Sequence, residues 1–415
     1  MPPRWVSLGE QDLMVFRVVT AFLSGRLEER GTLDWALKLE RRDAAKRIAL
    51  LELVDSPEGR KIREPWRTAW HWVEESWSYA PVDDTSIQVY QVKQRLQCGD
   101  RSGALIGELV GLVAPRLSVE TLSRSAFEPR VVPRRPKHVR DVLWARLNSG
   151  ETLDLSVLDL AEVTEVQFLV SLAGALERAV SHGLDIARRI GWDGTRRIWE
   201  LGQLHRVYYV PAIGQGAGEF EPDRFHRGIA PSVKLLHAVV ERLANVDLAA
   251  TLEFAQRWRV MKCPVHQRLW AALARDPRIS TSTEVGAFLL SLGVRPFWNS
   301  NDFPEIAELR ALRFGELELA IQRTLTARIR RLPPRNQWPG QIDTQKLDRA
   351  RFRLAARELR RIEVAGTRLQ PADEAWFDSI TSQFPDLAPM RRSTRDFSPQ
   401  RRPRSFRGRP TNTQS

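Results

Sequence analysis

The chain has 415 residues, of which 42% are hydrophobic and 28% are charged, so it can bury a sizeable core in two or three domains. Two cysteines, Cys98 and Cys263, are too few to hold a fold of this length together, and such low usage fits a reducing compartment. No apolar run of about 18 residues and no signal-peptide pattern occur, which excludes a membrane span and predicts a cytoplasmic protein.

The formal net charge of +13 is concentrated in two segments. Residues 124–140 carry six cations and one acid, and residues 391–415 carry eight arginines and one acid. The rest of the chain is therefore close to neutral. A basic protein often binds nucleic acid, but here the charge excess is expected in a linker and a tail.

The N-terminal third of the sequence predicts helices separated by short turns. Apolar residues recur at helical spacing in residues 8–77, and the pattern continues over 86–97 and 101–115. Three tryptophans, Trp66, Trp70 and Trp77, fall on one helix face. We expect them to fill helix–helix contacts rather than to form a ligand site.

A proline-rich basic stretch at residues 123–138 interrupts this pattern, and helix is excluded there. We interpret it as a linker or an exposed loop that separates an N-terminal helical domain, 1–122, from a helical-repeat-like domain, 139–387. A short strand is possible at 154–160. Further helices are expected at 166–182, 195–209, 231–243, 248–260, 264–275, 283–292, 306–331, 345–364 and 371–383.

This succession of helices predicts an all-α fold, either an irregular α-solenoid or two packed helical bundles. No fixed internal repeat is present. Residues 388–415 contain too few apolar side chains to offset the entropy of ordering the backbone, so we expect a disordered basic tail.

Motifs that would identify an enzyme are absent. There is no phosphate-binding loop, and Gly214, Gly216 and Gly218 neither follow a strand nor open a helix, so they predict a surface loop that could serve as a lid or a partner contact. Cys263 and His266 have a metal-like spacing, but no second pair exists to complete a zinc site. We predict no catalytic, cofactor-binding or metal-binding residues, and no cofactor.

One basic pattern is more specific. On a helix, Lys346, Arg349, Arg353, Arg357 and Arg360 share an arc of about 80°. Such a stripe is either a solvated face or a docking surface for an acidic partner or a phosphate backbone. The stripe is the candidate binding site of this chain.

Three apolar helical segments carry a resemblance to known proteins. Residues 233–243, 265–273 and 303–310 resemble helical-repeat regions of large, poorly characterised bacterial proteins, among them defence-type (STAND) scaffolds. The resemblance implies a non-enzymatic scaffold or adaptor that binds a partner protein. The alternative is a nucleic-acid-binding module that uses the basic helix 346–361 and the basic tail.

A second alternative is an enzyme. Arg259 and His266 are separated by six residues, which resembles the Arg-x(4–6)-His motif of a family of helical RNases. The likeness covers two residues, and a chain this rich in arginine produces such spacings by chance. The sequence therefore favours a protein that is not an enzyme.

Overall fold

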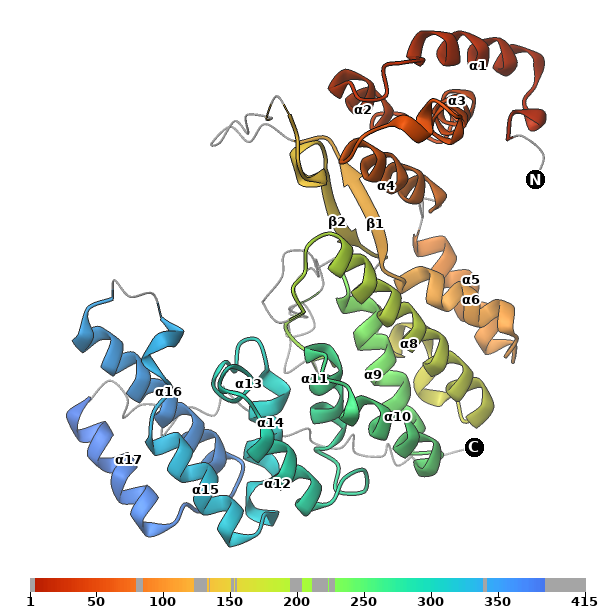
Figure 1. Cartoon of the computed structure of the whole chain (residues 1–415). Helices are drawn as coiled ribbons and strands as arrows, with labels where there is room; N and C mark the ends of the chain where they lie inside the picture. Colours follow the sequence, from red (N-terminus) through yellow and green to blue (C-terminus); the bar gives the residue numbers. More distant parts are fainter. Residues whose placement is uncertain are drawn as a thin grey trace, which may run out of the picture. The chain divides into compact units, whose positions relative to one another are not determined.

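The computed structural model shows a predominantly helical protein, as the sequence predicted, with one two-stranded sheet in the part of the chain that it describes (Figure 1). The structure describes residues 4–79, 85–122, 133, 135–150, 153, 155–194, 204–210, 223, 228–338 and 342–384. The chain divides into two compact units. Unit 1 comprises Met1–Leu204 and Pro222–Asp247, and unit 2 comprises His205–Glu221 and Leu248–Ser415.

Each unit has its own set of helices. Those of unit 1 are α1 (Glu10–Leu23), α2 (Arg30–Ala36), α3 (Ala44–Asp55), α4 (Trp66–Ser78), α5 (Thr85–Gln97), α6 (Gly103–Val113), α7 (Leu155–Leu158), α8 (Val166–Arg189) and α9 (Ala230–Leu243), with strands β1 (Arg116–Glu120) and β2 (Trp144–Asn148). Those of unit 2 are α10 (Leu248–Val260), α11 (Pro264–Leu273), α12 (Ser282–Ser291), α13 (Val294–Trp298), α14 (Pro304–Arg313), α15 (Leu319–Arg330), α16 (Thr344–Val364) and α17 (Pro371–Gln383).

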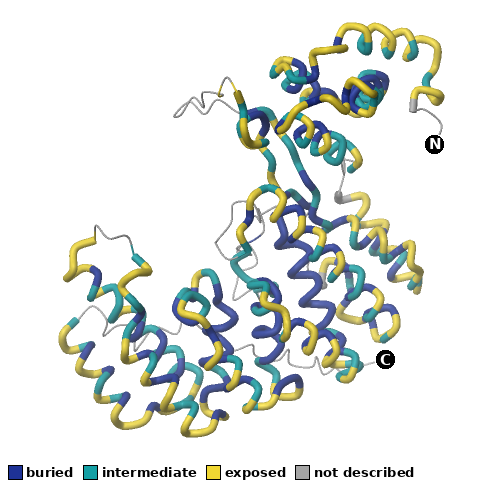
Figure 2. Tube along the Cα trace, viewed as in Figure 1, coloured by how far each residue is buried: buried dark blue, intermediate teal, exposed yellow. Residues whose placement is uncertain are grey.

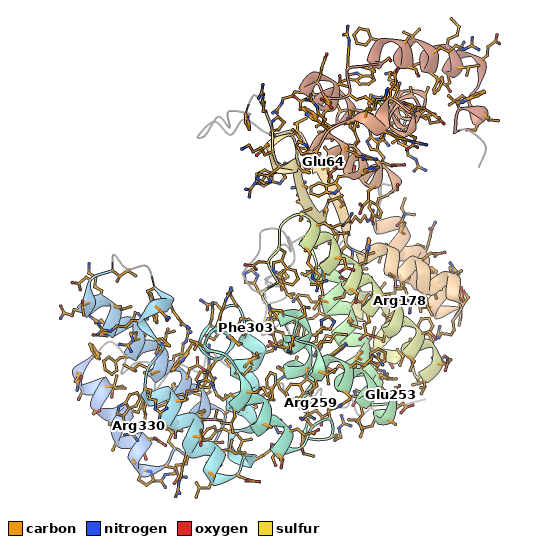
Figure 3. All side chains as sticks on the ribbon, viewed as in Figure 1. Glu64, Arg178, Glu253, Arg259, Phe303 and Arg330 are labelled. Carbon is orange, nitrogen blue, oxygen red and sulfur yellow. The ribbon has the colours of Figure 1, made fainter. Side chains whose placement is uncertain are left out.

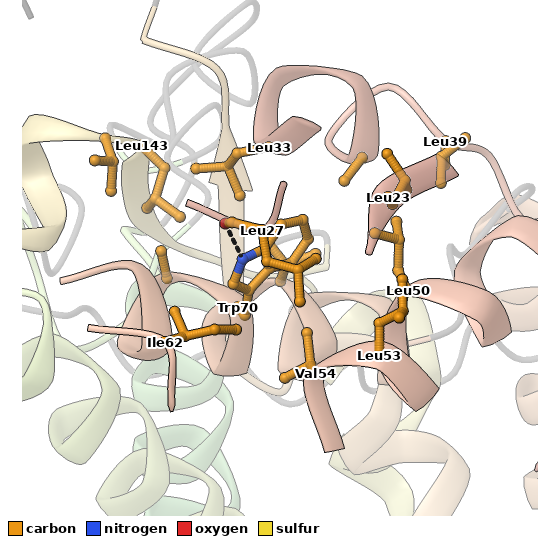
Figure 4. Packing of buried hydrophobic residues seen from close by; sticks show 14 residues of the cluster. Leu23, Leu27, Leu33, Leu39, Leu50, Leu53, Val54, Ile62, Trp70 and Leu143 are labelled. Atoms are coloured by element: carbon orange, nitrogen blue, oxygen red, sulfur yellow. Dashed lines mark hydrogen bonds between the residues drawn. The ribbon is translucent and has the colours of Figure 1, made fainter. Parts of the chain in front are cut away.

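The first four helices enclose an apolar core around Trp70 (Figure 4). Its indole is 1% exposed and donates a hydrogen bond of 2.9 Å to the backbone carbonyl of Leu27, so the one polar atom of this large side chain is satisfied. Trp66 and Trp77 are partly buried and pack against the same core. The prediction that the tryptophans fill helix contacts is confirmed.

A short antiparallel hairpin lies in unit 1, where the sequence predicted none. Leu117 of β1 is opposite Leu147 of β2, and both side chains are buried. The strands that flank residues 123–138 pair with one another within unit 1, so the boundary between two domains that was expected at this stretch is not observed. Most of the stretch is outside the described residues.

Other predicted boundaries also need correction. The strand expected at 154–160 is wrong, since residues 155–158 form helix α7. Residues 204–210 are not helical, although a helix was expected to run to 209. The helix expected over 306–331 is interrupted by a 3₁₀ turn, Phe314–Glu316. A Cβ on Gly315 in that turn would lie 2.8 Å from the hydroxyl of Thr367, so a side chain there would displace a neighbour.

Unit 1 contains a helix that is buried on nearly all sides, α9 (Figure 2). It packs against α8, and every residue from Ala230 to Val240 is buried. The buried set includes a charge: Lys234 lies 2.9 Å from the carboxylate of Asp223, and both side chains are 0% exposed. An ammonium at this depth requires such a partner.

The helices of unit 2 pack on one another in a succession typical of an irregular helical array (Figure 1). Helix α11 packs on α10 and α14, α14 on α16, and α16 on α15 and α17. Helix α14 is the central element, and nine of its residues are buried, including Glu305, Glu308, Arg310 and Arg313. None of the described helices combines the length and the apolar character needed to cross a membrane.

Candidate partner-binding surface

Helix α16 carries the basic stripe and begins at a defined cap. The carboxylate of Asp343 accepts a hydrogen bond of 3.0 Å from the backbone N–H of Lys346, which satisfies one of the free donors of the first turn. Leu347, Leu359 and Ile362 are buried on the opposite side of the helix. The local sequence therefore fixes both where the helix starts and which face remains available.

The first half of the stripe is exposed. Lys346, Arg349 and Arg353 all lie at the surface of α16. The nearest acid on this helix, Asp348, forms ion pairs of 2.8 Å with Arg351 and 3.0 Å with Arg335. The negative charge of Asp348 is thus already paired with two cations outside the stripe.

The second half of the stripe departs from the prediction, because α16 packs on α14 there. Arg357 is partly buried and donates a hydrogen bond of 2.5 Å to the hydroxyl of Ser300. Arg360 is also partly buried and lies 3.3 Å from Glu363. The expected five-residue docking arc is therefore exposed only from Lys346 to Arg353.

A buried ion pair anchors this second half to α14. Glu358 and Arg310 are each 1% exposed and bond to one another, and Arg361 also donates to Glu358. Burial by itself raises the pKa of the Glu358 carboxyl, but the surrounding arginines outweigh it and hold that pKa below its ordinary value. The guanidinium of Arg310 lies 4.4 Å over the ring of Phe297 and donates to the Phe297 carbonyl at 3.1 Å.

A second buried cluster, which the sequence did not single out, joins α14 to the segment 204–210. Glu305 pairs with Arg268 of α11 at 2.7 Å, and Glu308 lies 3.3 Å from both Arg206 and Arg275. Burial raises the pKa of Glu308, since desolvation outweighs the two arginines, whereas Arg268 reverses the same effect and lowers the pKa of Glu305. Glu305 and Glu308, one helical turn apart, therefore differ in the direction of their pKa shifts: burial among these partners favours the ionised form of Glu305 and the protonated form of Glu308.

The open depression at the end of α16 does not suggest chemistry. It has a volume of about 410 Å³, and its lining mixes cations and acids: Arg360, Glu363, Gly366, Thr367, Arg368 and Glu374. Opposite charges on the same wall neutralise one another, so the depression lacks the single-sign field that would select a charged ligand.

Arg259 and His266, the two residues of the RNase alternative, are not arranged as a catalytic pair. His266 is 3% exposed within α11, and Arg259, labelled in Figure 3, forms an ion pair with Glu284 of α12. A catalytic imidazole must reach the proton that it transfers, and that of His266 is covered in this conformation. The described residues contain no group of three or more His, Cys, Asp or Glu placed to hold a metal ion. Gly214, Gly216 and Gly218 lie outside the described residues.

Comparisons with known proteins give little further information. No family model matches the chain, and no solved structure matches it. The chain is 25% identical over 293 residues, or 69% of its length, to a protein of Sinorhizobium fredii (strain NBRC 101917 / NGR234) described as uncharacterized protein y4cA. The chain spans 23% of the length of that relative.

Proposed function

We propose that the protein is a non-enzymatic helical scaffold of the cytoplasm that binds an acidic partner protein through the first half of α16. The observation that carries this proposal is the exposed row Lys346, Arg349 and Arg353 on a helix whose other half is fixed in place. The row extends about 10 Å along the helix axis. That length matches two turns of an acidic helix on a partner.

The row lies on a helix whose second half is held in place by buried contacts. The buried pair Arg310–Glu358 lies one to two turns further along the same helix, so α16 is held before any partner arrives. A binding surface that is already ordered loses less conformational entropy on association. The bacterial relative is much longer than this chain, which is compatible with a helical module that works within a larger assembly.

A paired substitution experiment tests the proposal. Arg349→Glu and Arg353→Glu together reverse the charge of two of the three exposed cations, and Arg323→Glu with Lys262→Glu is the matched control, since both control residues are exposed cations of unit 2 outside α16. We expect both proteins to keep the circular dichroism and thermal midpoint of the parent, because exposed substitutions change stability by less than about 0.5 kcal/mol each.

The measurement is affinity capture: each tagged protein is incubated with native extract, and the molecules that it retains are identified. An acidic protein retained by the parent and the control, but lost from the Arg349/Arg353 variant, supports the proposal. Retention of nucleic acid, with a log–log salt slope that falls by about one for each phosphate contact removed, supports the alternative module instead. Equal retention by all three proteins shows that the row is a solvated face, and the proposal then fails.

A further inference from the structure

A short irregular segment lies at the point where the chain passes from one unit to the other. Leu204 is assigned to unit 1, but His205–Glu221 belongs to unit 2, and the chain returns to unit 1 at Pro222. The described part of this excursion, residues 204–210, has neither helix nor strand. Side chains of α11 and α14 contact residues 205–208, which we call the strap.

Charged side chains bind the backbone of the strap. The backbone N–H of Val207 donates to the carboxylate of Glu305 at 2.8 Å, and the guanidinium of Arg268 donates to the carbonyl of His205 at 3.0 Å. Arg268 and Glu305 also pair with one another, so the two groups that recognise the backbone hold each other in position. Between these bonds the side chain of Val207 is 0% exposed.

The side chains on either side of Val207 meet a second acid. The hydroxyl of Tyr208 donates to Glu308 at 2.7 Å, and the guanidinium of Arg206 lies 3.3 Å from the same carboxylate. Arg275 completes the arrangement, since its guanidinium lies 4.4 Å over the ring of Tyr208 and 3.3 Å from Glu308. The contacts of the strap thus include one buried aliphatic anchor, two backbone hydrogen bonds, and side-chain contacts of both Arg206 and Tyr208.

Peptide-recognition surfaces use these same elements: hydrogen bonds to the main chain supply affinity, and pockets for particular side chains supply specificity. We propose that α11 and α14 form a binding surface for a peptide segment with a basic–aliphatic–aromatic sequence, and that the strap occupies this surface in cis. A partner peptide with the same pattern gains access when the strap detaches. The surface is separate from the basic row of α16, so this inference does not depend on the proposed function.

The chemistry of the contacts favours detachment over permanent packing. A strand in a sheet is held by a continuous backbone ladder, whereas the strap is held by side-chain charges around one buried valine. The pair of Arg206 with Glu308 reaches the surface, since the side chain of Arg206 is 32% exposed, and salt weakens such a pair, whereas the buried pair of Arg268 with Glu305 is screened much less. The strap should therefore open at a lower free energy than the helices beneath it.

Hydrogen exchange on the intact protein tests detachment without any substitution. We expect the amides of residues 205–208 to exchange at least tenfold faster than those of α14, and the gap to widen when the salt concentration is raised from 50 to about 500 mM. Exchange of the strap at the same rate as α14 at both salt concentrations would mean that the two open together, and the inference would be overturned.

Peptide binding tests the surface itself. The probe is a fluorescent peptide with the sequence of residues 204–210, and its control replaces Arg206 by glutamate and Tyr208 by phenylalanine. We expect the probe to bind the Val207→Asp variant of the full chain at least tenfold more tightly than the parent, because the variant strap cannot keep its anchor buried. The control peptide should not bind.

Failure of the probe to bind a folded variant overturns the inference. If circular dichroism shows that Val207→Asp does not fold, Arg206→Ala replaces it, since that side chain is partly exposed and its loss removes the contact with Glu308 while Val207 stays in place. The exchange experiment decides the question of detachment in either case.

Discussion

Removal of the Glu358 carboxylate should destabilise unit 2 by several kcal/mol. In Glu358→Ala the guanidinium of Arg310 loses its buried partner while it remains 1% exposed. A buried ion pair that loses one partner typically costs about 3–5 kcal/mol, because the other charge is left without compensation. A second guanidinium, that of Arg328, lies 3.9 Å over the same Phe297 ring, so the remaining charges also repel one another.

The effect can be measured by thermal unfolding followed through the tryptophans of unit 2, among them Trp258, Trp270 and Trp298. A unit of this size shifts its midpoint by about 2–4 °C per kcal/mol, so we expect a loss of roughly 6–20 °C. Because the chain has two units, the transition of unit 2 must be followed separately from that of unit 1.

A double variant supplies the control. Glu358→Leu with Arg310→Met replaces the pair by apolar side chains of similar size, which is often neutral or stabilising. We expect the double variant to recover most of the stability lost by Glu358→Ala. A loss below about 1 kcal/mol in the single variant would show that Arg310 reaches water or another partner, and would refute the argument from burial.

Three further predictions concern the core and its acids. Trp70→Phe should cost about 1–3 kcal/mol in denaturant unfolding, because a buried carbonyl loses its donor. Gly59→Ala should destabilise by about 1–3 kcal/mol, since a Cβ there would lie 2.1 Å from a backbone oxygen, whereas Gly107→Ala has free space within α6 and should gain about 0.5–1 kcal/mol. At pH 7, Glu305→Gln should lower the free energy of unfolding more than Glu308→Gln does. Because the pKa of Glu305 is lowered in the folded state, its carboxylate stabilises the fold above the ordinary carboxyl pKa, and acid removes that stability. Because the pKa of Glu308 is raised, its contribution favours the fold at low pH and is lost as pH rises through the pKa of the folded state. The difference in unfolding free energy between the two variants should therefore shrink as the pH is lowered.

Helical periodicity in the sequence was sufficient to predict most of the helices. The pattern over 345–364, for example, corresponds to α16 at Thr344–Val364. The strands were missed because five residues provide too few alternations to separate a strand from a helix end. Leu117 is buried, but its neighbours in β1 are only partly covered, so the pairing with β2 and not the local pattern determines this structure.

The candidate site was predicted only in part, for a related reason. A helical projection shows which residues share a face, but not where along the helix a neighbour covers that face. Arg353 and Arg357 lie on the same arc, yet Arg353 is exposed, whereas Arg357 is partly buried and donates a hydrogen bond to Ser300 of another segment. The charges of α14 were not identified, because a glutamate such as Glu305 is ordinarily a surface residue, and its partners come from positions distant in the chain.

The buried amine of Lys234 makes the opening of unit 1 chemically observable. Acylating reagents modify a lysine only where its amine reaches solvent in the neutral form, and this amine is 0% exposed and paired with Asp223. Lys262 and Lys346 are exposed and should react at once. The rate at which Lys234 is modified, measured by mass spectrometry, would therefore report how often α9 separates from its surroundings. The exposed lysines of the same molecule supply the reference rate of modification.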